Sequence, residues 1–269
     1  MFIDDKSEEG PKNFERIVSF SPAITEILFA LNLGDKVVGV TSFCKYPEAV
    51  LDKDKYADIG TLFNTNFEKL AELNPDLVIF QKTNTMQKAK LDDMKINSMM
   101  IELKRLDQII DVSAKIAQKT GQSDELAKTL IEQRDALIAE NENKKKLKIL
   151  IMVDSNYVAG AKTIYDDMIK DLNCVNAYSG NLSYPKLSAE DLIEMNPELI
   201  IQIAPDLNEK VSEDDLLNKW YEKPHLKAVE NKQVYILFNS YAVLPGPRFI
   251  LTMQDIATCL KKAREVYSK

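Results

Sequence analysis

The sequence predicts an α/β protein built from two similar lobes that one long α-helix joins. Segments rich in β-branched residues alternate with helical segments in both halves, which is the pattern of central, mostly parallel sheets. A twelve-residue segment occurs twice: EKLAELNPDLVI (68–79) and EDLIEMNPELII (190–201) are identical at seven positions, with an offset of 122 residues. Between the halves, residues 123–146 contain no glycine or proline. A duplicated lobe with a helical connection explains these observations together.

The first half contains the strand and helix signals of one lobe. Ser21 is a good helix N-cap and Pro22 suits the first helical position, so a helix is expected to begin there. The segment LVIF (77–80) is apolar throughout, as expected of a strand that is buried on both faces. The predicted strands are 16–20, 36–42, 76–80 and 96–103, and further helices are predicted at 67–74 and 106–119.

The second half repeats this order of elements. Strands are predicted at 146–153, 198–203 and 232–238, and helices at 161–172, 189–196 and 248–267. In the joining helix, Ser123 provides the N-cap, and Lys144, Lys145 and Lys146 close the helix, where cations suit the negative end of its dipole. The predicted organisation is a flexible leader at 1–13, a first lobe at 14–122, the joining helix at 123–146 and a second lobe at 147–269.

Composition and charge exclude several classes of partner. The formal net charge of −7 gives no electrostatic support for binding nucleic acid or an anionic membrane surface. No apolar run approaches the ~18–20 residues that span a bilayer. Residues 1–13 are polar and contain no intact export signal. This segment fits a mature chain after removal of an export signal and a cytosolic start equally well.

Residue types that bind metals or carry catalysis are sparse. Cys44, Cys174 and Cys259 are far apart and lack C-x-x-C or Cys/His spacing, so we expect buried thiols rather than metal ligands or disulfides. The G-x-G-x-x-G and G-x-S-x-G fingerprints are absent, and AGAKT (159–163) lacks the glycine spacing of a phosphate loop. His225, the single histidine, is expected to be structural. The sequence therefore predicts no intrinsic cofactor, no metal site and no catalytic residue.

The acidic pairs of the sequence have a simpler explanation than catalysis. They lie in polar helical or loop surroundings, where solvated faces account for them. The pairs are Asp92–Asp93, Asp166–Asp167 and Asp214–Asp215.

Polar and aromatic residues follow the predicted strand ends in both halves. Open α/β sheets bind ligands at the carboxyl ends of their strands, and aromatic and amide side chains there suit a large, semi-polar small molecule. Each residue alone also fits an ordinary loop, but the set from two facing lobes predicts a ligand cleft between them. The candidates are Ser21, Phe43, Lys45, Tyr46, Asn64, Asn66 and Gln81 in the first half, and Asn156, Tyr157, Tyr178, Tyr184, Tyr241 and Arg248 in the second.

Arg248 follows the stiff Pro-Gly-Pro turn of YAVLPGPRF (241–249), and two interpretations are open. In one, proline initiates the last helix and the arginine is solvated. In the other, the turn holds a cation at the rim of the cleft.

Nearly the whole chain, from Asn13 to Tyr267, resembles the periplasmic cobalamin-binding and ferric-siderophore-binding receptors of ABC importers. The first lobe resembles theirs in RIVSFSPAITEI, TSFCKYPEAV and IGTLFNTNFEKLAELNPDLVI, and the second in YVAGAKTIYDDMIKDL, SAEDLIEMNPELII and KQVYILFNSYAVLPGPRF. The resemblance implies two Rossmann-like lobes bridged by a single helix, with the ligand held in the cleft and little closure. By position, it assigns to the ligand site Phe43, Tyr46, Phe63, Asn64, Tyr157, Tyr178, Tyr241 and Arg248.

The resemblance also gives a function for the repeated segment. In these receptors a surface glutamate on each lobe docks onto arginines of a homodimeric ABC permease, and Glu68 and Glu190 are the matching residues. A two-fold partner presents the same basic pocket twice, so a receptor that docks as a monomer must present the same acid twice. The alternative is that both glutamates only favour a helix N-terminus, an effect of ~0.3–1 kcal/mol.

The resemblance favours a corrinoid as ligand, then a ferric siderophore, then haem. SPAITE, SFCKYPE and YVAG are closer to the cobalamin-binding branch, and the chain has few arginines for an anionic chelate. The cleft of this family is often rich in tryptophan, whereas Trp220 is the only one here and fits a structural helix end. Direct capture of zinc or manganese is disfavoured, because such sites need several His and carboxylate ligands.

Two other functional classes remain open from the sequence. A two-lobed α/β enzyme, such as a glycosyltransferase or a chelatase, would need His225 as its base. A sensor or scaffold would need a fused output domain. The resemblance instead implies a periplasmic or otherwise extracytoplasmic chain, which a lipid-bearing cysteine ahead of Met1 could anchor.

Overall fold

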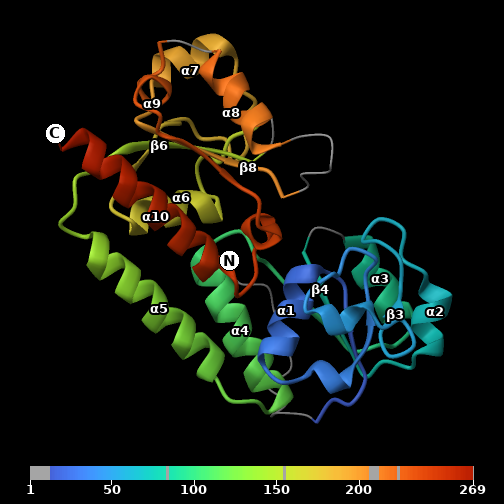
Figure 1. The fold of residues 1–269 in the computed structure, drawn as a ribbon. Coiled ribbons are helices and arrows are strands. Elements are labelled where there is room, and N and C mark those ends of the chain that lie inside the picture. The colour runs from blue at the N-terminus through green and yellow to red at the C-terminus, as the bar shows by residue number, and fades with distance from the viewer. Residues whose placement is uncertain (1–12, 83–84, 154–155, 206–211, 223–224, 269) are drawn as a thin grey trace. The chain divides into compact units, whose positions relative to one another are not determined.

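The computed structural model describes residues 13–82, 85–153, 156–205, 212–222 and 225–268 (Figure 1). The chain divides into two compact units. The first lobe comprises Met1–Leu103 and Asp107–Leu130, and the second comprises Lys104–Leu106 and Ile131–Lys269. The three residues Lys104–Leu106 therefore belong to the second lobe, although the chain on both sides of them belongs to the first.

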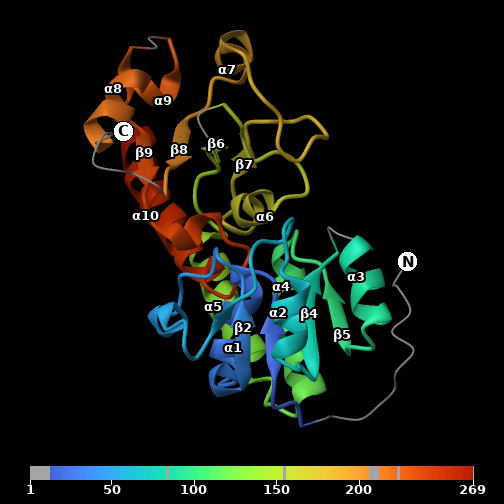
Figure 2. The ribbon, with the colours of Figure 1, turned by 90° about the vertical axis from the view of Figure 1, so that its right-hand side faces the viewer.

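The first lobe is built on a five-stranded parallel sheet in the order β3-β2-β1-β4-β5. Figure 2 shows β4 and β5 side by side, with α3 next to β5. One face is covered by α2 and α3, through Leu70 and Leu91. The elements are β1 Ile17–Ser19, α1 Pro22–Ala30, β2 Val37–Val40, β3 Ala57–Asp58, α2 Phe67–Glu72, β4 Leu77–Gln81, α3 Thr85–Asp93, β5 Ser98–Ile101 and α4 Leu106–Thr120, with 3₁₀ turns at Gly34–Lys36 and Glu48–Leu51.

The second lobe is built on a four-stranded parallel sheet in the order β7-β6-β8-β9. Residues of α7, α8 and α9 cover one face, where Leu192, Trp220 and Val229 pack on the strands. The elements are β6 Lys148–Met152, α6 Ile164–Asp171, β7 Val175–Asn176, α7 Ala189–Met195, β8 Leu199–Ile203, α8 Glu213–Tyr221, α9 Lys227–Glu230, β9 Val234–Leu237 and α10 Phe249–Tyr267, with a 3₁₀ turn at Ser240–Val243.

The long helix between the halves is α5, Glu125–Asn141, which is shorter than the predicted 123–146. Ser123 caps it, since its Oγ accepts a hydrogen bond from the N–H of Glu125 at 3.2 Å. The helix ends at Asn141, whose amide turns back and donates to the carbonyl of Leu137 at 2.8 Å. The lysines at 144–146 therefore lie beyond the helix and do not close it.

The acid of the repeated Asn-Pro-Asp/Glu segment has the same structural part in both lobes. The backbone N–H of Arg16 donates to Asp76 Oδ1 at 3.0 Å, immediately before β1. In the second lobe the N–H of Lys148, at the start of β6, donates to Glu198 Oε2 at 3.0 Å. Asp76 directly precedes β4 and fixes the beginning of β1, which pairs with β4. Glu198 directly precedes β8 and fixes the beginning of β6, which pairs with β8. The repeat is accounted for in part by this packing of two neighbouring strands.

Two of the expectations about side chains are confirmed within the described residues. Cys44, Cys174 and Cys259 are buried and unpaired with one another. Trp220 is 4% exposed at the end of α8, and its indole N–H donates to Gln202 Oε1 at 2.7 Å. In the part of the chain that the structure describes, no helix is long and apolar enough to cross a membrane. Nor does any cluster of His, Cys, Asp and Glu there suit a metal ion.

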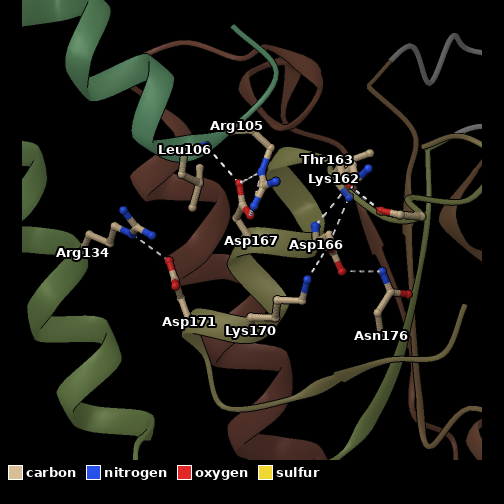
Figure 3. A network of polar contacts seen from close by, with 11 residues as sticks. Arg105, Leu106, Arg134, Lys162, Thr163, Asp166, Asp167, Lys170, Asp171 and Asn176 are labelled. Carbon is tan, nitrogen blue, oxygen red and sulfur yellow. Dashed lines mark hydrogen bonds and ion pairs between the residues drawn. The ribbon is translucent and has the colours of Figure 1, made fainter. Parts of the chain in front are cut away.

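The expectation for Asp166–Asp167 is wrong, because both side chains are buried in the second lobe (Figure 3). The Arg105 Nε–H is shared between Asp167 Oδ1 at 2.9 Å and Oδ2 at 2.7 Å, and Arg105 Nη2 also donates to Oδ1. The N–H of Leu106 donates to Asp167 Oδ2 at 3.1 Å. Asp166 accepts from the side chain of Asn176 at 3.2 Å. The partners of Asp167 lie far away in the sequence, whereas Asp166 is paired with closer residues, among them Lys170 Nζ at 2.7 Å. These bonds make the burial of two adjacent carboxylates tolerable. The pairs Asp92–Asp93 and Asp214–Asp215 are exposed, as expected.

Candidate functional site

Exposed aromatic residues follow β2 at the carboxyl edge of the first sheet. Phe43 is 62% exposed and Tyr46 is 48% exposed, and Lys45 between them is exposed as well. Cys44 points the other way and is buried, with its Sγ 3.2 Å from Thr25 Oγ1 and 3.3 Å from Thr41 Oγ1. The buried thiol anchors the loop, so its neighbours are displayed from a fixed backbone.

A tight loop after β3 displays Phe63, which is 90% exposed. Gly60 begins the loop with φ +87°, and a Cβ there would lie 2.4 Å from the carbonyl oxygen of Asn64. Thr61 and Asn64 close the turn, since the N–H of Asn64 donates to the Thr61 carbonyl at 3.2 Å and to Thr61 Oγ1 at 3.1 Å. The loop therefore holds a large apolar side chain in solvent on a closely constrained turn.

Asp58 joins the two loops that carry these aromatic residues. Its Oδ1 accepts from Ser42 Oγ and from the N–H of Gly60, both at 2.8 Å. Burial alone would raise the pKa of Asp58, but these two hydrogen bonds, together with the charges of Lys53 and Lys69, outweigh it and hold the pKa below its usual value of 3.8. The carboxylate is thus ionised at neutral pH and fixes the Phe43 loop against the Phe63 loop.

Three of the predicted polar residues have structural contacts of their own. Ser21 is 8% exposed, and its Oγ accepts from the N–H of Ile24 at 3.3 Å and from Gln81 Nε2 at 3.1 Å. Asn66 caps α2 by accepting from the N–H of Lys69 at 2.9 Å. The exposed members of the first-lobe set are Phe43, Lys45, Tyr46, Phe63, Asn64 and Asn66.

In the second lobe, exposed tyrosines lie on two segments that pair with each other. Tyr157 is 44% exposed and Tyr184 is 50% exposed, and Asn156 is exposed beside Tyr157. The N–H of Leu187 donates to the Asn156 carbonyl at 3.2 Å, and the N–H of Val158 donates to the Pro185 carbonyl at 3.1 Å. Both tyrosines therefore belong to one locally paired unit that follows β6.

Tyr178 is held by packing rather than displayed. It is half-buried and packs against the core of the second lobe. A Cβ on Gly160 would lie 2.9 Å from its ring and 2.2 Å from the Leu182 carbonyl oxygen. Only glycine at 160 leaves room for the ring and for the neighbouring segment.

The turn after β9 is braced from two helices. The Tyr165 hydroxyl on α6 donates to the Ala242 carbonyl at 2.6 Å. The Tyr241 hydroxyl donates to Asp255 Oδ2 on α10 at 2.8 Å, and the guanidinium of Arg248 lies 5.5 Å from the Tyr241 ring centroid. Burial and the Asp255 carboxylate raise the pKa of Tyr241 to about 12. Arg248 directly precedes the first residue of α10 and is half-buried, so it is not fully solvated, and its place at the rim of a cleft stays a prediction.

The sequence did not single out two exposed apolar residues near these loops. Met86 on α3 is 80% exposed and Leu182, next to the Tyr184 segment, is 63% exposed. Met86 follows the end of β4 in the sequence, and this position could have marked it as a candidate for the ligand site. Leu182 had no signal, because its position depends on the pairing with 160–161.

Two hollows among the described residues lie away from most of the candidate set. The larger, about 800 Å³, lies between α5 and α10 and is lined by residues such as Asn141, Lys261 and Arg264. The smaller, about 250 Å³, lies beside α7 and includes Tyr178. Within each lobe, the exposed members of the candidate set form a displayed aromatic surface.

Glu68 and Glu190 are exposed at matching positions of the repeat helices. Each lies in the first turn, of α2 and of α7 respectively. The caps also match, since Asn66 and Ser188 each precede their helix and accept from an N–H three residues on.

Comparison with known proteins places the chain in one family. The family model described as periplasmic binding protein matches residues 17–241. An uncharacterised ABC transporter substrate-binding lipoprotein of Bacillus subtilis is 28% identical over 273 residues, covering 95% of this chain and 83% of that protein. A vitamin B12-binding protein of Vibrio cholerae is 24% identical, covering 98% and 96%.

A solved structure agrees with these relatives. The crystal structure of a possible iron-binding periplasmic solute-binding protein from Staphylococcus epidermidis has a TM-score of 0.78 and 26% sequence identity. It covers 93% of this chain and 99% of the other.

Proposed function

The chain belongs to the periplasmic binding protein family, and we propose on this basis that it captures a corrinoid for an ABC importer and delivers it to a homodimeric permease. The family consists of binding proteins, so the chain is not an enzyme. The relatives include an ABC transporter substrate-binding lipoprotein and a vitamin B12-binding protein. We propose an extracytoplasmic location for the same reason.

The observation that carries the ligand proposal is the display of large apolar side chains on the loops that follow the strands. Phe63 at 90% exposure and Phe43 at 62% are unusual on a folded surface, because burying such a side chain gains about 1.5–3 kcal/mol. In the second lobe, Tyr157 and Tyr184 supply aromatic surface with a polar tip. Such surfaces suit a macrocycle with broad apolar faces and amide substituents at its edge.

Two cations accompany the aromatic residues, one in each lobe. Lys45 is exposed between Phe43 and Tyr46, and Arg248 stacks on Tyr241. Each can meet an anionic group of the ligand, such as a phosphate. A phosphate-bearing corrinoid offers both the faces and the charge.

A ferric chelate or haem is the second candidate. The relative from S. epidermidis, described as a possible iron-binding protein, favours it. The exposed tyrosines also offer oxygen atoms, which are hard ligands as carboxylate oxygens are, and such ligands suit iron.

We also propose that Glu68 and Glu190 dock onto the permease. The two glutamates are exposed on helices whose N-cap side chains each accept from an N–H three residues on, and each helix is followed by a buried strand. A two-fold permease would meet them as equivalent acids. We propose that the protein acts as a monomer in this complex.

The test of the ligand is a calorimetric titration of the purified protein with cyanocobalamin, and with haem and a ferric siderophore in parallel. One-to-one binding of cyanocobalamin that is tighter than binding of the iron ligands supports the corrinoid. Binding of haem or the ferric siderophore, without binding of cyanocobalamin, would overturn the corrinoid as ligand but leave the proposal of a receptor intact. Binding of none of the three overturns the ligand proposal.

A further inference from the structure

A buried glutamine on α3 lies directly behind the loop that displays Phe63. Gln87 is 3% exposed, in the first turn of α3. Leu91, one turn further on, is fully buried in the core cluster of the first lobe. Residues four apart share a face of a helix, so Gln87 points from the packed face of α3 and not into solvent.

The amide of Gln87 reaches the tip of the loop. Its Nε2 donates to the carbonyl oxygen of Leu62 at 2.6 Å and lies 3.4 Å from Thr65 Oγ1. Leu62 directly precedes Phe63, so this bond fixes the peptide from which the exposed ring projects. At the base of the loop, the N–H of Ser42 donates to the Gly60 carbonyl at 2.9 Å. Nearer the tip, the other bonds connect neighbours in the sequence, such as Thr65 Oγ1 to the Thr61 carbonyl at 3.0 Å. Gln87 ties the tip to a different element, 25 residues away.

The same side chain is a poor choice for stability alone. Gln87 Oε1 is buried and has no hydrogen-bond partner among the described residues. The amide cannot be turned over, because only its nitrogen can donate to the Leu62 carbonyl. A buried acceptor without a donor is destabilising, and an apolar side chain of similar length would avoid that cost. The glutamine therefore has a use that the packing of α3 does not explain.

We propose that Gln87 is a positioning residue for the ligand: it holds the Leu62–Phe63 tip so that the Phe63 ring is ordered before the ligand arrives. This rests on the proposed function, since Phe63 must contact the ligand. A loop that is ordered in advance loses less conformational entropy on binding. Gln87 acts through the backbone of Leu62 and does not itself touch the ligand.

The test compares Gln87→Met with the wild type in the ligand-free protein first. Methionine keeps the length and the apolar stem but cannot donate. We expect faster amide hydrogen exchange at 61–65, unchanged exchange in β1 and β4, and a melting temperature at or above that of the wild type. The matched control is Gln118→Met, on the exposed face of α4, which should leave exchange in the loop unchanged. Unchanged exchange at 61–65 in Gln87→Met overturns the proposal.

The second part is a double-mutant cycle with Phe63→Ala, titrated with cyanocobalamin. We expect Gln87→Met to weaken binding about tenfold in the wild-type background and to have no further effect when Phe63 is already alanine. Additive effects would mean that Gln87 does not act through Phe63, and would overturn the proposal. If the wild type does not bind cyanocobalamin, the corrinoid proposal fails, and the exchange measurement still decides whether Gln87 positions the loop.

Discussion

Asn74 and Asn196, which are 122 positions apart, adopt the same left-handed backbone, with φ of 43° and 41°. Each follows a repeat helix and precedes a proline, so each turns the chain from the helix into a buried strand. Asparagine tolerates this conformation better than other residues with a Cβ.

Replacing Asn74 by alanine should therefore destabilise its lobe by about 1 kcal/mol, while glycine should have little effect. At Asn196 both replacements also remove the bond that its Oδ1 accepts from the N–H of Lys227 at 2.8 Å, so glycine should be destabilising there too, but less than alanine. Urea unfolding of Asn74→Ala, Asn74→Gly and the same pair at 196 measures this. Equal stability of the alanine and glycine variants would show that the left-handed turn is not the reason for asparagine at these positions.

Asp167→Asn should destabilise the second lobe through loss of the pair with Arg105. Breaking a buried ion pair costs about 3–5 kcal/mol, but the Arg105 side chain is 39% exposed, so we expect about 1–3 kcal/mol. Thermal unfolding measures the change. Asp135→Asn, an exposed position on α5, is the control and should change stability by less than about 0.5 kcal/mol.

Acid should destabilise the protein in part through Asp166. Burial alone would raise the pKa of Asp166, but hydrogen bonds from Lys170, Asn176 and the N–H of Lys162 outweigh it and hold the pKa below 3.8. A carboxylate whose pKa is lower in the folded state contributes stability above its unfolded pKa, and this contribution is lost as the pH falls through the folded value. Below about pH 4, the free energy of unfolding should fall less steeply in Asp166→Asn than in the wild type. Parallel curves for the two proteins would contradict this.

Phe63→Ala should weaken ligand binding about ten- to a hundredfold, because an exposed ring of this size gains about 1.5–3 kcal/mol when a ligand covers it. Titration with cyanocobalamin measures the loss. Ile193→Ala is the matched control, since Ile193 is also an exposed apolar residue, 56% exposed, but lies on α7, the helix that leads to the amino end of β8. Equal losses in both variants would argue against a specific role for Phe63.

Charge reversal at Glu68 and Glu190 together should abolish stimulation of the transporter ATPase and leave ligand affinity unchanged. The reason is that lysines would face the basic pockets proposed for the permease. The control is Asp93→Lys with Glu230→Lys, which changes the net charge by the same amount at exposed sites, one in each lobe. Stimulation that survives in Glu68→Lys/Glu190→Lys would remove the docking assignment.

Strands and helix starts could be predicted from the sequence where they depend on neighbouring residues alone. Leu77–Phe80 is fully buried, as the apolar run of β4 required, and Ser21 and Pro22 begin α1 as their local chemistry predicts. The helix α3 was missed because its sequence TMQKAKLDD has few apolar residues to reveal a period. The capping box of Ser212 and Asp215 was a readable signal for α8 that the prediction did not use.

The sequence was insufficient where a side chain depends on a distant partner. Two adjacent aspartates in a polar segment read as solvated, and only the fold brings Arg105 to Asp167, 62 residues away. Gln87 gives no signal either, because its role depends on a loop 25 residues earlier. Exposure of Phe63 at 90% likewise follows from the turn at Gly60 and not from the residue itself.

The hydrogen bonds from Arg105 and Leu106 to Asp167 limit where the gene for this protein can be divided. The repeat suggests that each half is an independent folding unit and that the chain can be divided near residue 123. Such a cut would give the second fragment its own sheet but leave Asp167 buried without Arg105 and without the N–H of Leu106. A fragment that begins near residue 123 would therefore contain the buried carboxylate of Asp167 without these partners. The second lobe thus depends on Lys104–Leu106, which precede the long helix in the sequence.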